Sequence, residues 1–79
     1  MMDRRTLVEY ARKGIMAEIR EHEKTVMRGR AYLKAIDNGE RVKTPLTPSE
    51  IEAVIAKAKE KIETLSNEER ELRYERDFD

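Results

Sequence analysis

Apolar side chains recur every three or four residues along two long stretches of this 79-residue chain. Residues three and four apart lie on one face of a helix, so the spacing predicts two amphipathic helices. We expect the first helix over residues 4–38 and the second over residues 48–76. The first face is formed by Val8, Ala11, Ile15, Ile19, His22, Val26, Gly29, Leu33 and Ile36. The second face is formed by Ile51, Ile55, Ala58, Ile62, Leu65, Glu69 and Leu72.

The ends of the first predicted helix carry residues that start and stop helices. Asp3 or Thr6 is expected to cap its first turn, because a short polar side chain can accept a hydrogen bond from a free backbone N–H. Asn38 and Gly39 predict its end, because a helix commonly closes on a residue in the left-handed conformation. The linker is then expected to span residues 39–47.

The start of the second predicted helix is marked more fully. Thr47 and Glu50 have the spacing of a capping box, and Pro48 occupies the first helical position, where its missing N–H costs nothing. Leu46 before the cap and Ile51 after it have the spacing of a hydrophobic staple. These signals predict a sharp helix start directly after the linker.

A chain folded back at this linker forms an all-α, coiled-coil-like hairpin of two antiparallel helices within a single domain, residues 1–79. Folding at the middle of the linker brings Gly29 opposite Ala58, and glycine inside a helix is often compensated by close approach of a neighbour. The same register places Leu33 opposite Val54, Val26 opposite Ile62, and His22 opposite Leu65. Basic residues exceed acidic ones in the first half and acidic ones exceed basic ones in the second, which favours this arrangement.

Two helices alone enclose little core, because each buries one stripe and leaves its flanks in water. Some 43% of the residues are charged and only 38% are hydrophobic, which makes an isolated hairpin of this size marginal. We therefore expect a homodimer that forms a four-helix bundle, or a hairpin that is completed by a larger protein. The expected contact strip consists of Leu7, Met16, Met27, Ala31, Ala35 and Val54.

His22 is the only histidine and lies on the predicted seam. Glu18 precedes it by one turn, and Glu69 is expected to approach it from the second helix. We favour a polar seam residue that fixes the register; the alternatives are a pH-sensitive contact and a metal site completed by a dimer. The chain has no cysteine, and its three glycines are isolated and form no phosphate-binding loop. We predict no enzyme activity, no cofactor, no metal and no small-molecule substrate.

Basic side chains gather near the end of the first helix and in the linker. The candidate basic patch consists of Lys24, Arg28, Arg30, Lys34, Arg41 and Lys43. Pairing with Glu40, Glu50 and Glu52 is the favoured interpretation, and a contact with a phosphate backbone is the alternative. At the opposite end, Tyr10, Tyr74 and Phe78 are expected to gather near Leu7, either pinning the chain ends or docking a partner.

These patterns predict a small, non-enzymatic protein–protein interaction module, an adaptor, regulator or inhibitor that acts through its helix faces. A nucleic-acid-associated regulator is the alternative, and a net charge of zero counts against it. Because no apolar run is long enough to span a membrane or to form a signal-peptide core, we expect a cytoplasmic protein. Its size and composition suit a phage or mobile-element protein.

Overall fold

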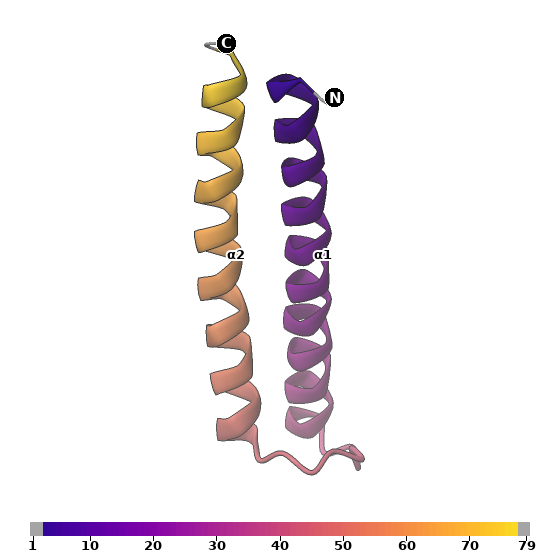
Figure 1. Cartoon of the computed structure of the whole chain (residues 1–79). Coiled ribbons are helices and arrows are strands. Elements are labelled where there is room, and N and C mark those ends of the chain that lie inside the picture. Colours follow the sequence, from indigo (N-terminus) through magenta and orange to yellow (C-terminus); the bar gives the residue numbers. More distant parts are fainter. Residues whose placement is uncertain (1–2, 78–79) are drawn as a thin grey trace.

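The computed structural model describes residues 3–77, with side chains up to Tyr74, and consists there of two helices. Helix α1 spans Arg4–Asp37 and helix α2 spans Pro48–Asp77. They run antiparallel and side by side, so the start of α1 and the end of α2 lie at the same end of the molecule (Figure 1). The body measures 56 × 19 × 16 Å. The predicted all-α helical hairpin is confirmed.

The hydrogen bonds that close both ends of α1 involve the residues expected from the sequence. Oδ1 of Asp3 accepts a hydrogen bond from the backbone N–H of Thr6 at 2.8 Å, which makes Asp3 the N-cap. At the other end Gly39 has a φ of +77°, a conformation that suits glycine. The N–H of Gly39 donates to the carbonyl of Ile36, and that of Glu40 to the carbonyl of Ala35. This pair of bonds is a Schellman motif, which satisfies carbonyls at the helix end.

The capping box at the start of α2 is formed as the sequence predicts. Oγ1 of Thr47 accepts from the N–H of Glu50 at 3.2 Å, and Oε1 of Glu50 accepts from the N–H of Thr47 at 3.4 Å. Leu46 and Ile51 line the same small hollow, which agrees with the expected staple. The chain therefore enters α2 in a direction fixed by local bonds.

The apolar core lies in the half of the hairpin nearest the linker, which we call the closed half. Its buried members are Val26, Ile51, Ile55 and Ala58, with Tyr32, Leu33, Ile36 and Ile62 packed against them. In the half that contains the start of α1 and the end of α2, which we call the open half, Val8 and Ile19 are the buried hydrophobic residues among those whose side chains are described. Two helices thus bury a narrow seam only, as expected for a hairpin.

Gly29 marks a close contact between the two helices, and this contact corrects the predicted register. A Cβ atom placed on Gly29 would lie 2.6 Å from Cγ1 and 2.9 Å from Cδ1 of Ile55, and 3.5 Å from Cγ2 of Ile51. The expected pairing of Gly29 with Ala58 is therefore wrong by about one helical turn. The branched Ile55 needs a space that only a residue without a Cβ can leave, whereas Ala58 does not. Side-chain fit, and not the midpoint of the linker, sets the register.

Candidate functional site

The predicted seam residues are all buried or half-buried, and among the other residues placed on the two faces one is exposed. Buried members are Val8, Ile19, Val26, Gly29, Ile51, Ile55 and Ala58. Half-buried members are Ile15, His22, Leu33, Ile36, Ile62, Leu65 and Leu72. Ala11, which the spacing also placed on the first face, is exposed.

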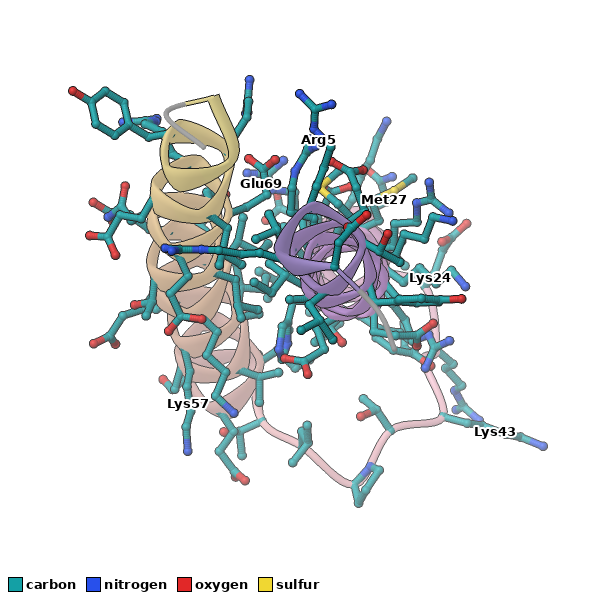
Figure 2. The ribbon with its side chains drawn as sticks, turned by 45° about the horizontal axis from the view of Figure 1, so that its top comes forward. Arg5, Lys24, Met27, Lys43, Lys57 and Glu69 are labelled. Atoms are coloured by element: carbon teal, nitrogen blue, oxygen red, sulfur yellow. The ribbon has the colours of Figure 1, made fainter. Side chains whose placement is uncertain are left out.

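Glu69 is a buried carboxylate, and it joins the two helices in the open half (Figure 2). Its Oε1 accepts from Nε of Arg12 at 2.8 Å and lies 2.8 Å from Nη2 of the same guanidinium. Its Oε2 accepts from Nη2 of Arg73, one turn further along α2, at 2.7 Å. Arg12 also donates to Glu9 at 3.0 Å. The side chain of Glu69 is only 8% exposed, so its charge needs these partners.

The hydrogen bonds from Arg73 and Arg12 lower the pKa of the Glu69 carboxyl and outweigh burial, which acts to raise it. The hydrogen bond with Glu69 likewise raises the pKa of Arg12. A carboxylate held in this way stays charged at lower pH than a free one. The arrangement stabilises the pairing of the helices and holds both oxygens of Glu69.

The predicted approach of Glu69 to His22 is therefore wrong. Both Glu69 oxygens are held by arginines, and the α1 partner is Arg12, nearly three turns before His22. Sequence reasoning missed Arg12, although one signal was available. A glutamate at a seam position needs a basic partner, and the facing helix offers arginine at this level.

An open groove, which we call the interhelical groove, runs along one side of the seam as three connected hollows. The first, of about 420 Å³, is lined by Glu18, His22, Lys57, Glu60, Lys61, Thr64 and Leu65. The second, of about 160 Å³, is lined by His22, Thr25, Val54, Lys57, Ala58 and Lys61. The third, of about 130 Å³, is lined by Thr25, Arg28, Gly29, Tyr32, Leu46, Ile51 and Val54. Neighbouring hollows share residues, so the groove is continuous.

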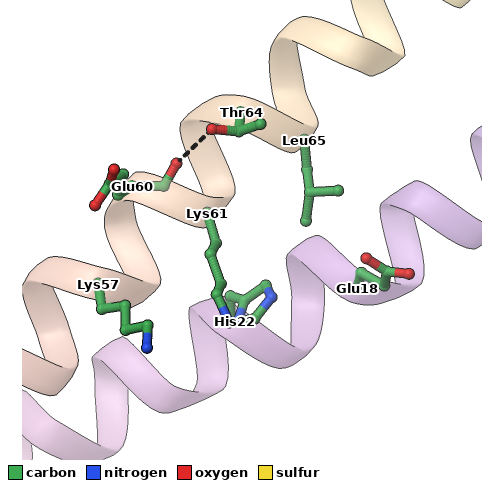
Figure 3. A pocket seen from close by; sticks show the side chains of 7 residues that line it. All are labelled: Glu18, His22, Lys57, Glu60, Lys61, Thr64 and Leu65. Atoms are coloured by element: carbon green, nitrogen blue, oxygen red, sulfur yellow. Dashed lines mark hydrogen bonds between the residues drawn. The ribbon is translucent and has the colours of Figure 1, made fainter.

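The groove has an apolar floor and charged edges. Leu65 points between the helices, and Lys61 extends from α2 across the first hollow toward His22 of α1 (Figure 3). Glu18 lies on the α1 edge of the same hollow, with Lys57 on the α2 edge. Within residues 3–77, no ion pair or hydrogen bond holds the side chains of these two residues or of Lys61. Their charges are therefore available to a molecule that enters the groove.

The six residues of the predicted contact strip do not form one surface. Leu7, Met16, Met27, Ala31 and Val54 are exposed, Met27 to 70%, while Ala35 is half-buried. Val54 lines the interhelical groove, whereas Met16 lines a separate hollow on α1 with Arg12 and Arg20. Met27 lies on a side of α1 that faces away from α2 (Figure 2). Because Val54 and Met27 lie on different sides of the hairpin, the six residues do not form the single strip that was predicted.

The predicted basic patch lies at the closed end, but its side chains spread around it. All six members, Lys24, Arg28, Arg30, Lys34, Arg41 and Lys43, are exposed. Arg28 and Arg30 are about 200° apart around α1, and Lys43 lies on the linker (Figure 2).

The acidic partners expected for this patch do not pair with it. Lys24 pairs with Glu21 at 3.3 Å, and no ion pair in the described part of the chain joins the patch to Glu40, Glu50 or Glu52. Glu50 closes the capping box instead. The favoured structural interpretation of the patch is therefore wrong.

At the open end Tyr10 and Tyr74 are both exposed, and Phe78 lies outside the described residues. Lys13 Nζ lies 6.0 Å from the centre of the Tyr10 ring, within reach of a cation–π contact. The expected aromatic cluster is thus described only in part, and it contributes no buried side chain there.

Comparison with known proteins leaves the groove as the main guide to function. No protein-family model matches the chain, and no curated protein and no solved structure is significantly similar to it. Between residues 3 and 77, neither helix is apolar enough over a sufficient length to cross a bilayer. The same residues contain no group of three His, Cys, Asp or Glu side chains placed to hold a metal ion.

Proposed function

We propose that the protein is a non-enzymatic protein–protein interaction module, and that its interhelical groove receives a helix of another polypeptide chain. The observation that carries this proposal is the groove itself, with an apolar floor and unpaired charges at its edges. Amphipathic helices commonly bind by laying an apolar face into such a groove. An adaptor, regulator or inhibitor of a larger protein would use it in this way.

The energetics of a two-helix fold support the same proposal. The buried hydrophobic residues are few, and Leu7 and Val54 remain 55% and 40% exposed. Helices that share a core usually gain one or two further neighbours, as in four-helix bundles. A helix laid over the groove would cover Val54 and Leu65 and would add the contacts that two helices cannot supply.

Site-specific photocrosslinking in the native host tests this function. The photoreactive residue p-benzoylphenylalanine would replace Val54 in the groove or, as a matched control, the exposed Glu63 on the same helix. We expect a discrete protein adduct from position 54 and little or none from position 63. No adduct from position 54, or equal adducts from both positions, would overturn the proposal.

A nucleic-acid-associated regulator is a second candidate, favoured by the absence of acidic partners for Arg28, Arg30 and Arg41 within the described residues. These arginines are dispersed around the closed end, so they support nucleic-acid binding less than the groove supports helix docking. If the protein binds nucleic acid, its affinity should fall steeply with salt, and the changes Arg28→Glu, Arg30→Glu and Arg41→Glu together should remove that dependence. No binding at low salt removes this candidate.

A further inference from the structure

The charges that border the first hollow of the groove are arranged in a complementary way. Glu18 is on the α1 edge at one end of this hollow, Lys57 is on the α2 edge toward its other end, and Lys61 extends from α2 between them (Figure 3). None of the three takes part in an ion pair with the rest of residues 3–77. A surface that carries both signs of charge along one hollow can pair with a copy of itself.

We propose that the polypeptide that covers the interhelical groove is a second copy of this chain, an inference that rests on the proposed function. The two grooves face each other across a two-fold axis parallel to the helices, so that α1 of each copy lies over α2 of the other. In such a symmetric contact each residue pair occurs twice. Lys61 of each copy then reaches Glu18 of the other, and the product is an antiparallel four-helix bundle.

The alternative two-fold arrangement fits the charges poorly. In that alternative the two-fold axis is perpendicular to the helices and passes through the first hollow, so that α2 of one copy lies on α2 of the other. Lys57 and Lys61 of both copies would then lie together, and like charges brought together in an interface are strongly unfavourable. The axis parallel to the helices avoids this contact and brings opposite charges together at both symmetric positions.

Area and net charge also favour a second copy. One broad face of a body of 56 × 19 Å offers on the order of 1,000 Å², against about 800 Å² per partner in an interface of standard size. The chain has a formal net charge of zero, so two copies approach without overall repulsion. The floor residues Val54 and Leu65 would lose their contact with water.

Sedimentation equilibrium on the full chain, over about a hundredfold range of concentration, measures this dimer, with circular dichroism on the same samples. The variants Glu18→Lys and Lys61→Glu each place like charges together at both symmetric positions. We expect each to raise the dimer dissociation constant about tenfold or more. Glu63→Lys, on the outer face of α2, makes the same change of charge as Glu18→Lys and should leave the constant within about twofold.

Mixing the two variants gives the sharpest result. In a mixed dimer, Lys at position 18 of one copy meets Glu at position 61 of the other, and the native Glu18 and Lys61 form the second pair. An equimolar mixture should therefore recover a dimer close to wild type, although each variant alone dissociates. This recovery also shows that both variants fold, since an unfolded chain could not restore the complex.

Any other result of these experiments overturns the proposed dimer. A wild-type protein that stays monomeric over the whole range excludes the second copy, and photocrosslinking at position 54 then decides separately whether another protein fills the groove. A dimer that withstands both charge changes, or a mixture that stays dissociated, excludes the proposed arrangement.

Discussion

The two halves of the hairpin have the same secondary structure but are held together by different interactions. In the closed half, Ile55 packs against Gly29, and a continuous apolar core surrounds them. In the open half, the buried carboxylate of Glu69 is shared between Arg12 of α1 and Arg73 of α2. Apolar burial is insensitive to pH, whereas an ion pair requires its carboxylate to be charged. The two ends of one fold should therefore respond differently to the same perturbation.

The difference follows from residue types at equivalent seam positions. Ile51 and Ile55 bring large side chains to the closed half, and Gly29 gives them room, so the backbones approach closely there. Four turns further along α2 the same face carries Glu69, which cannot be buried unpaired. Long arginine side chains then span the gap that apolar side chains fill at the other end.

The largest expected effect is the loss of Ile55 from the core. Ile55→Ala removes buried methyl and methylene groups beside Gly29 and should lower the free energy of unfolding by about 2–5 kcal/mol. Ile15→Ala, the same change at a half-buried position of the open half, should cost less. Urea unfolding followed by circular dichroism measures both, at equal protein concentration. Equal losses would contradict tighter apolar packing around Ile55 than around Ile15.

The second largest effect on stability is expected when the space at Gly29 is filled. In Gly29→Ala the new Cβ would lie 2.6 Å from Cγ1 of Ile55, so the helices must separate or Ile55 must shift. Overpacking of about 1–3 kcal/mol should exceed the gain of about 1 kcal/mol from better helix propensity. In the Ile55→Ala background the same change should stabilise the protein, because the obstruction is gone. A double-mutant cycle checks this reversal of sign, and additivity of the two changes would contradict the assigned contact.

Acid should weaken the open half through Glu69. Because the pKa of this carboxyl is lower in the folded chain than its ordinary value of 4.5, its contribution to stability is complete above that value. The contribution is lost as the pH falls through the lower pKa of the folded state. Glu69→Gln should be less stable than wild type at neutral pH and should lose less stability on acidification.

Urea unfolding at neutral and acid pH compares wild type, Glu69→Gln and the exposed control Glu63→Gln. The Glu63→Gln variant should follow the wild type at both pH values, because that side chain is exposed on the outer face of α2. If wild type and Glu69→Gln lose the same amount of stability on acidification, Glu69 does not hold the open half together.

The smallest expected effect concerns the cap of α2. Thr47→Ala removes the oxygen that accepts the Glu50 N–H at 3.2 Å and should lower the free energy of unfolding by about 1 kcal/mol. Thr47→Ser keeps this acceptor and should remain close to wild type. If both changes have the same effect, the capping bond contributes nothing measurable.

The sequence predicted what depends on neighbours along the chain. The Asp3 cap, the end at Gly39 and the capping box of Thr47 each involve residues within a few positions of one another. The stripe that includes Glu69 likewise follows from helical periodicity alone. These local signals were sufficient for both helices and for the hairpin.

Features that depend on residues far apart in the chain were missed. The contact of Gly29 with Ile55 depends on side-chain shape, which the length of a linker does not determine. Arg12 was overlooked because its partner, Glu69, is 57 positions away. The groove was also not foreseen, since Val54 was assigned to a strip that the folded chain does not form.

Amide hydrogen exchange at neutral and acid pH tests the contrast between the halves most directly, because it reports local opening along the whole chain. After correction for intrinsic rates, we predict that amides around Ile55 keep their protection at acid pH. Those around Glu69 and Arg12 should lose theirs. Equal loss along both helices, or greater loss around Ile55, would contradict an apolar closed half and an ionic open half.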